Sequence, residues 1–110
     1  MNFQEYQNES KKTSVYKELG VDNVLYLMTA LTGEIGEVAE KIKKTYRDNK
    51  GDFDEERKVL LQKEFGDVLW CLSQLCTELG ISFDEVATSN IEKVFSRKER
   101  DAVHVGGDIR

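Results

Sequence analysis

Proline is absent from this 110-residue sequence, glycine occurs only eight times, and no long apolar run is present. Because proline and glycine are the main helix breakers, their scarcity favours long helices. No segment alternates apolar and polar residues in the way typical of a half-buried strand. Without a run of about 18 apolar residues we expect no transmembrane helix, and without a basic-then-apolar leader we expect no secretory signal. The sequence therefore predicts an all-α protein of the cytoplasm.

Histidine and cysteine are also scarce, which excludes several kinds of site. Cys71 and Cys76 lie five residues apart, a spacing that matches neither redox nor zinc motifs. The single histidine, His104, lies in the C-terminal tail, so zinc sites and Ser–His–Asp catalysis lack their residues. A di-iron bundle would need Glu-x-x-His pairs, and the sequence has none. We expect two reduced, half-buried thiols and no part for His104 in metal binding.

Basic residues are outnumbered, with 16 Lys and Arg against 21 Asp and Glu and a net charge of -5 at pH 7. This balance argues against binding to nucleic acid or to an anionic membrane, since both need a basic surface. A nucleotide accompanied by metal ions remains compatible with it. The length suffices for one domain and not for two ordinary ones, so we expect residues 1–110 to form a single domain.

Apolar residues recur at three- and four-residue intervals in four segments. The predicted helices are Phe3–Leu19, residue 23 to about residue 47, residues 55–79, and residue 83 to about residue 98. Asp22, Asp54 and Ser82 are the predicted N-caps of the last three, and Ser82 also begins a capping box. The fourth helix should turn its apolar residues, Phe95 among them, inward. We expect a four-helix, antiparallel bundle-like protomer that oligomerises through helix faces, with residues 101–110 as a flexible tail.

Two pairs of carboxylates lie three residues apart within the second and third predicted helices, namely Glu34 with Glu37 and Glu64 with Asp67. Residues i and i+3 share a helix face, so each pair can converge on one point. If residues 48–52 form a tight turn between antiparallel helices, both pairs lie roughly 17 Å from it and therefore at one height. A rotation of about 100° per residue also places both pairs on the same side of the helix–helix seam.

Four carboxylates at one height repel each other strongly unless cations neutralise them, and hard cations such as Mg²⁺ prefer oxygen ligands. With 21 acidic residues, however, such pairs also arise by chance, and Glu37 with Glu40 shows the same spacing. From the pattern alone, a metal cage and a solvated acidic face are equal alternatives. Gly33 and Gly36 beside the first pair are likewise open to two interpretations, close helix packing or room for a metal-bound ligand.

Two further features accompany the acidic pairs. Asn90, Lys93, Arg97 and Arg100 form a stripe on the fourth predicted helix that could hold phosphate oxygens, with an ordinary basic surface as the alternative. Trp70 lies almost opposite the apolar stripe of the third helix, so a single chain should leave it exposed. We interpret Trp70 as a subunit-interface residue, with stacking on a nucleobase as the second interpretation.

At these residues the chain resembles the MazG-like, all-α nucleoside triphosphate pyrophosphohydrolases. The family signature is E-x-x-E, a spacer and E-x-x-D, and it is matched by Glu34, Glu37, Glu64 and Asp67. The resemblance covers most of the chain, since it extends to Tyr6-Gln7, to Asn90-x-x-Lys93-x-x-x-Arg97 and to the ending Gly106-Gly107-Asp108-Ile109-Arg110. The ending departs from the fuller Gly-x-Gly-Asp form, because Val105 precedes Gly106.

The resemblance implies hydrolysis of a nucleoside or deoxynucleoside triphosphate between the α and β phosphates, giving a monophosphate and pyrophosphate, in the service of nucleotide-pool house-cleaning. It implies that the four acids are the catalytic residues and the ligands of Mg²⁺, or alternatively Mn²⁺. It further implies that Asn90, Lys93 and Arg97 bind the substrate, and that the protein is a homodimer or homotetramer with its site near a subunit boundary. The alternative is a non-catalytic helical binding module of the same fold; the loss of one acid would favour it, and all four are present.

Overall fold

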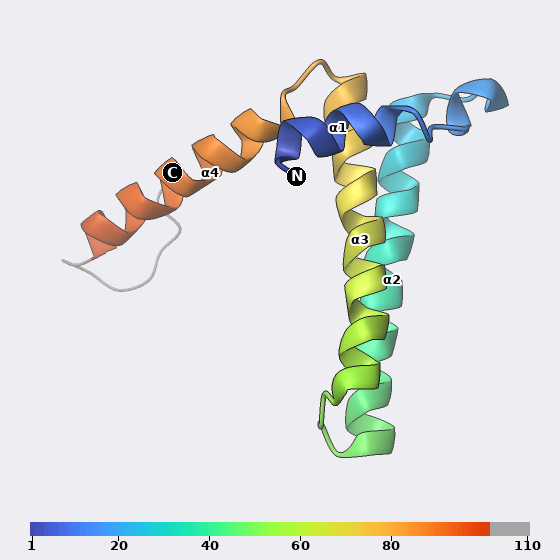
Figure 1. The fold of residues 1–110 in the computed structure, drawn as a ribbon, viewed down its shortest axis with the longest axis vertical. Coiled ribbons are helices and arrows are strands. Elements are labelled where there is room, and N and C mark those ends of the chain that lie inside the picture. Colours follow the sequence, from blue (N-terminus) through green and yellow to red (C-terminus); the bar gives the residue numbers. More distant parts are fainter. Residues whose placement is uncertain (102–110) are drawn as a thin grey trace.

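The computed structural model describes residues 1–101, which form four α-helices and one short 3₁₀ helix (Figure 1). The elements are α1 (Phe3–Lys11), η1 (Tyr16–Leu19), α2 (Asn23–Asn49), α3 (Glu55–Glu78) and α4 (Phe83–Asp101). No strand occurs among the described residues, so the predicted all-α, bundle-like class is confirmed. The predicted tail lies outside the described residues except for Asp101, which ends α4, and the Gly106-Gly107 ending lies outside them entirely.

The predicted N-caps of α2, α3 and α4 are confirmed. The side chains of Asp22 and Asp54 each accept a hydrogen bond of 3.0 Å from the backbone N–H three residues later. Ser82 accepts the equivalent bond at 3.2 Å. Each cap satisfies a backbone donor that the first helical turn leaves without a partner. These three residues therefore fix where the long helices begin, and with them the height of every side chain along α2 and α3.

The first predicted helix is wrong in its second half. Helix α1 ends at Lys11, and the hydroxyls of Thr13 and Ser14 then donate to backbone carbonyls three residues earlier, at 2.8 and 2.9 Å. Such local side-chain bonds compete with continuation of the helix. The chain resumes as η1, which ends at Gly20 in a left-handed conformation with φ of 69°. The break lets residues 12–19 fold back against α3 instead of extending α1.

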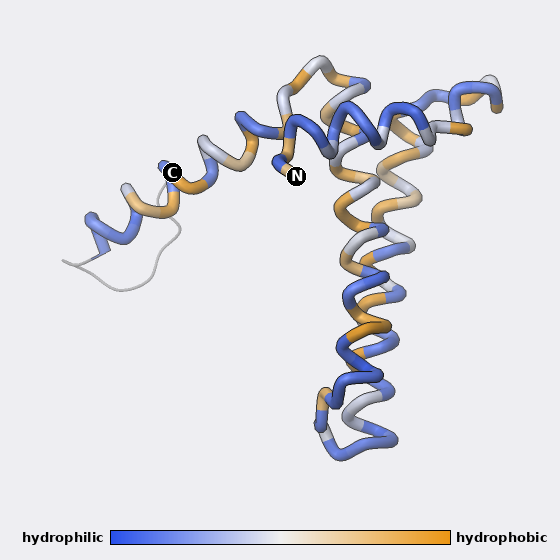
Figure 2. Tube along the Cα trace, in the orientation of Figure 1, coloured by the Kyte–Doolittle hydropathy of each residue, from blue (hydrophilic) through white to orange (hydrophobic). Residues whose placement is uncertain are grey.

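Helices α2 and α3 form an antiparallel hairpin and lie side by side along its whole length (Figure 1). The buried apolar residues of the hairpin include Leu27, Leu31 and Leu61. Figure 2 shows that apolar residues concentrate in the half of the hairpin near α1, whereas the half near the α2–α3 turn is mostly hydrophilic. The hairpin therefore has a packed half that holds the fold together and a polar half available for charged side chains.

Helix α1 crosses the packed end of the hairpin and contacts both α3 and α4. Gln7 is buried there; its amide nitrogen donates to the carbonyl of Ile81 at 2.9 Å, and its amide oxygen accepts from the backbone N–H of Phe83 at 2.9 Å. One side chain thus satisfies both a donor and an acceptor of the α3–α4 turn. Gln7 is one of the two N-terminal residues in which the sequence resembles the MazG-like family. Its hydrogen bonds hold α1 to the start of α4.

Helix α4 extends away from the hairpin (Figure 1) and makes its contacts with α1 and with the end of α3, not with α2. Phe83 at its start is buried against Phe3, whereas Phe95 is 60% exposed. The prediction that the apolar residues of this helix face inward is therefore wrong beyond its first turns. No helix among the described residues is both long and apolar enough to cross a membrane.

Candidate functional site

Three of the four predicted acids converge on one point of the α2–α3 hairpin. Carboxylate oxygens of Glu34 from α2, and of Glu64 and Asp67 from α3, all lie within 4.8 Å of one another. Glu34 and Glu64 are half-buried and Asp67 is exposed. The equal heights inferred from the sequence are thus realised, because both helices begin at their predicted caps and run antiparallel. We call Glu34, Glu64 and Asp67 the acidic cluster.

The fourth predicted acid, Glu37, is exposed and lies outside this group of mutually close oxygens. Its charge nevertheless acts on Glu34, whose pKa is raised by burial first and then by the charges of Asp67, Glu64 and Glu37. Like charges and partial burial both disfavour the ionised form of a carboxyl group. The site therefore concentrates negative charge that a cation would relieve.

The surface beside the acidic cluster is open at three glycines. A Cβ added at Gly33, Gly36 or Gly66 would meet no other atom within 4 Å. Close packing of these glycines against another helix, one of the two interpretations of Gly33 and Gly36, is therefore not found among the described residues. The remaining interpretation, that they leave room beside the carboxylates, agrees with the geometry of the chain.

A lysine that the sequence patterns did not single out neighbours the acidic cluster. The Lys41 ammonium nitrogen lies 3.6 Å from a carboxylate oxygen of Glu64, and their side chains are only 29% and 17% exposed. Lys41 lies seven residues after Glu34, which is two turns along the same helix face. That spacing is the signal that could have found it. The pair gives the cluster one internal positive charge.

Beneath the cluster, one turn after Asp67 on α3, lies the buried thiol of Cys71. Its pKa is raised by burial and then by the charges of Glu34 and Asp67, so the thiol stays protonated at neutral pH. Both Cys71 and Cys76 are free, as predicted. A protonated, buried thiol is a poor nucleophile, and Cys71 forms part of the floor under the carboxylates.

A mostly apolar cavity of about 350 Å³ lies where α1, α3 and the start of α4 meet. Its lining consists of Met1, Asn2, Phe3, Tyr6, Leu69 and Asp84. The pKa of Tyr6 is raised by burial first and then by the charge of Asp67, which places this cavity wall within electrostatic reach of the acidic cluster. Aromatic walls next to a set of carboxylates could accommodate a flat organic group attached to a charged one.

The predicted phosphate-binding row lies apart from the acids within one chain. Asn90, Lys93 and Arg97 are all on α4, which does not contact α2 (Figure 1). Asn90 and Lys93 are exposed, and Arg97 is half-buried. The structure therefore brings three of the predicted site residues together and leaves this row on a helix that leads away from them.

Trp70 is covered within the chain, which corrects the expectation that a single chain exposes it. Its indole nitrogen donates to the hydroxyl of Thr13 at 2.8 Å, and its ring meets Tyr16 edge-on with centroids 6.1 Å apart. The cause is the break after α1, which folds residues 12–19 over this face of α3. Neither a subunit interface nor a stacked base is needed to explain the position of the ring.

Comparison with known proteins identifies the family of the chain. The family model of the MazG nucleotide pyrophosphohydrolase domain matches residues 22–101, a range that contains α2, α3 and α4. The chain is also similar to the Gene 37 protein of Mycobacterium phage L5, with 36% identity over 109 residues that cover 96% of each protein. No solved structure matches the chain significantly. Because the family match spans most of the chain and includes all four acids, this protein belongs to the MazG nucleotide pyrophosphohydrolase domain family.

Proposed function

We propose that this protein is a metal-dependent nucleoside triphosphate pyrophosphohydrolase that acts on ribo- or deoxyribonucleotides in nucleotide-pool house-cleaning. The observation that carries the proposal is the convergence of carboxylates from two helices at the E-x-x-E and E-x-x-D positions. In the reaction, the oxygen of water forms a bond to the α phosphorus while the bond from that phosphorus to the α–β bridging oxygen breaks. Pyrophosphate leaves, and a nucleoside monophosphate remains.

The donor set fits a hard divalent cation, Mg²⁺ in the first place and Mn²⁺ as the alternative. Glu34, Glu64 and Asp67 supply oxygen ligands close together, and Glu37 is the fourth acid of the set. When bound, the ion would offset the charge on the phosphates and the charge that develops as the bond breaks. The pKa of Glu34 is raised by burial first and then by the charges of Asp67, Glu64 and Glu37, and a bound cation would relieve the second of these causes.

The side chains have separate parts in the proposed reaction. One of the four acids accepts the proton of the attacking water, and the choice among them stays open. The cavity near α1 is the proposed place for the nucleobase, since Phe3, Tyr6 and Leu69 line it with apolar and aromatic groups and the charge of Asp67 acts on Tyr6.

A homodimer or homotetramer is part of the proposal. Ile35 and Phe65 flank the acids and are each 53% exposed, and Phe95 on α4 is more exposed still. Large apolar side chains gathered on unpartnered helix faces favour association. A second copy could bring Lys93 and Arg97 of its α4 to the acidic cluster of the first, which would complete a substrate site that a single chain leaves divided.

The proposed function is tested by measuring pyrophosphate and monophosphate release from a panel of common and modified NTPs and dNTPs, with Mg²⁺ and with EDTA. We expect equal amounts of the two products, dependent on the metal, with a ranking across the panel that names the preferred base and sugar. No release from any nucleotide, together with no metal binding by calorimetry, would favour the alternative of a non-catalytic binding module.

Subunit complementation tests the proposed sharing of residues between copies. Glu64→Gln and Lys93→Gln variants should each be inactive alone, whereas refolding them together should restore about a quarter of wild-type activity through random pairing in a two-fold dimer. Full activity of the Lys93→Gln variant alone would contradict a catalytic contribution from α4.

A further inference from the structure

The ion pair between Lys41 and Glu64 joins the two helices of the hairpin. The ammonium nitrogen of Lys41, on α2, lies 3.6 Å from a carboxylate oxygen of Glu64, on α3. The other ion pairs within residues 23–78 join residues at most four positions apart. Local pairs of that kind are common on solvated helix faces and stabilise little. The Lys41 pair differs from them because it crosses between helices and ends on a member of the acidic cluster.

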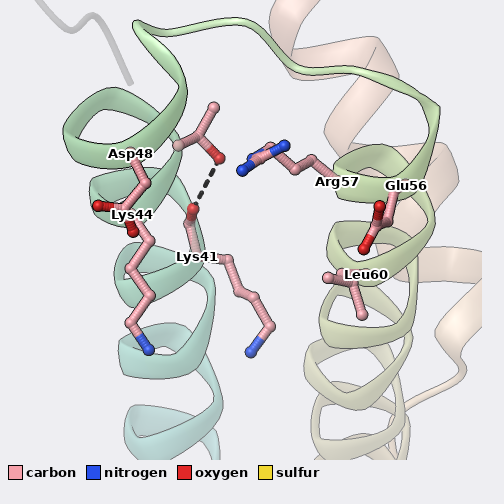
Figure 3. A pocket seen from close by; sticks show the side chains of 7 residues that line it. Lys41, Lys44, Asp48, Glu56, Arg57 and Leu60 are labelled. Carbon is pink, nitrogen blue, oxygen red and sulfur yellow. Dashed lines mark hydrogen bonds between the residues drawn. The ribbon is translucent and has the colours of Figure 1, made fainter.

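The surroundings of Lys41 direct its charge toward the acidic cluster. Figure 3 shows its side chain leaving α2 for the space between the helices and pointing away from the α2–α3 turn, whereas the Lys44 side chain stays beside α2. The Lys41 side chain lines a cavity of about 200 Å³ together with Thr45 and Leu60, and it is only 29% exposed. A lysine with a covered aliphatic stem keeps its charged end within a narrow region. Lys41 therefore holds a positive charge against α3.

The geometry of the pair also makes it easy to separate. Its distance of 3.6 Å exceeds the roughly 2.7–2.9 Å of a tight charge-assisted hydrogen bond. The ammonium group sits at the end of a flexible four-carbon stem, so it can leave Glu64 by rotation of its own side chain. Neither helix has to move. The pair thus has the properties of a counter-ion that another cation can replace.

A divalent ion at the acidic cluster would compete with Lys41 for Glu64. Glu64 is one of the three acids whose oxygens lie within 4.8 Å of one another, so an ion among them would lie within several ångströms of the Lys41 ammonium. Two positive charges at such a distance repel each other. Without the ion, the same ammonium offsets part of the repulsion among the carboxylates. One side chain therefore has opposite effects on the metal-free and the metal-bound protein.

We propose that Lys41 is an internal counter-ion of the acidic cluster, which a divalent ion must displace from Glu64 in order to bind. This inference rests on the metal dependence in the proposed function, since the displacing cation is the proposed metal. Lys41 is accordingly a positioning residue: it holds Glu64 in the metal-free protein and lowers the affinity of the cluster for the free ion. A purely structural ion pair would stabilise the protein equally with and without metal.

The test is calorimetric binding of Mg²⁺ and of Mn²⁺ to the full chain, without nucleotide. Lys41→Gln should bind the metal about fivefold more tightly, because it removes a positive charge beside the ion. Lys41→Arg keeps that charge and should bind within about twofold of the wild type. Lys44→Gln is the matched control, with a change within about twofold. Lys44 lines the same cavity but pairs at 3.7 Å with Glu40, outside the acidic cluster.

Thermal unfolding supplies a readout that a structural role would not move. In EDTA the Tm of Lys41→Gln should be about 2 °C below that of the wild type, because repulsion among the carboxylates is then unopposed. The rise in Tm on addition of metal should be larger in the variant, since stabilisation by a ligand grows with its affinity. An equal loss of Tm in EDTA and in metal would show a structural pair and would overturn the proposal.

The outcomes separate the counter-ion from the proposed reaction. Equal or weaker metal binding by Lys41→Gln would overturn the counter-ion even if metal-dependent cleavage of nucleotides is observed. Tighter binding by Lys41→Gln and not by Lys44→Gln would support it even if no nucleotide is cleaved, in which case only the hydrolysis fails. Absence of metal binding in the wild type and in all variants would overturn both the counter-ion and the proposed metal dependence.

Discussion

The α2–α3 hairpin and α4 are both amphipathic, yet they differ in what covers their apolar residues. In the hairpin each helix covers the other, and Leu27, Leu31 and Leu61 are buried. In α4 the described residues cover only the first turns, and Phe95 remains 60% exposed. The acidic cluster lies on the α2–α3 hairpin, whose apolar residues are buried. Asn90, Lys93 and Arg97 lie on α4, whose apolar residues are mostly exposed. The comparison indicates that the hairpin of one chain assembles the acidic cluster by itself, whereas residues 1–101 leave the distal part of α4 exposed.

The largest expected effect is the loss of activity when an acid of the α2–α3 hairpin is replaced. Glu64→Gln should lower kcat by about 10³-fold or more, because it removes a charged oxygen ligand from the acidic cluster. Helicity by circular dichroism should be unchanged, since relief of like-charge repulsion does not harm the hairpin. Glu55→Gln, which removes an exposed acid of the same helix, should keep activity within about twofold. Comparable losses of activity in both variants would show that the acidic cluster contributes no more to catalysis than an exposed acid of α3 does.

The next effect concerns the attachment of α4. Gln7→Ala should lower the free energy of unfolding by about 2 kcal/mol, because it leaves the Ile81 carbonyl and the Phe83 N–H buried without their partner. Urea denaturation monitored by circular dichroism measures the change. Gln4→Ala is the control, since Gln4 is exposed and bonds only to Asn8; its effect should be within about 0.5 kcal/mol. A Gln7 effect no larger than that of Gln4 would contradict the anchoring role.

A smaller effect should appear on the part of α4 that no other described element covers. Phe95→Ser should weaken self-association about tenfold or more, because a large aromatic side chain would no longer be buried between copies. Light scattering over a range of protein concentrations measures this, with Glu99→Ser on the same helix as the polar control. Unchanged association in the Phe95 variant would show that this face of α4 does not lie in the interface.

The smallest effect is the pH dependence of the metal-free protein. Because the pKa of Glu34 is raised in the folded chain from its ordinary value of 4.5, the folded state binds this proton more tightly than the unfolded state does. Stability should therefore fall as the pH rises above 4.5 through the raised pKa. Glu34→Gln should remove this fall and stabilise the metal-free protein at neutral pH by a few tenths of a kcal/mol. A larger fall with pH in the variant than in the wild type would contradict the assignment.

Much of the hairpin could be predicted from the sequence, since caps at Asp22 and Asp54 and a regular rise along each helix determine which residues are level. The convergence of Glu34 with Glu64 and Asp67 follows from those two facts. The path of residues 12–19 could not be predicted, because it depends on hydroxyl bonds of Thr13 and Ser14 that interrupt an otherwise helical pattern.

The direction of α4 and the position of Trp70 also could not be predicted from the sequence pattern. An apolar stripe indicates that a helix face becomes buried, but not which partner covers it, and residues 1–101 give α4 little cover. Trp70 is covered by a segment whose position depends on the unpredicted break after α1. Lys41 was missed because one lysine in a charged helix resembles any solvated residue until its distance to Glu64 is known.

In the proposed reaction, the acidic cluster directs water to the α phosphorus of a nucleoside triphosphate. The most direct measurement is hydrolysis of a cleaved nucleotide in water enriched in ¹⁸O, with mass analysis of both products. Attack at the α phosphorus places ¹⁸O in the nucleoside monophosphate and none in the pyrophosphate. Label in the pyrophosphate, or release of single phosphates in its place, would show that water attacks a different phosphorus and would contradict the claim.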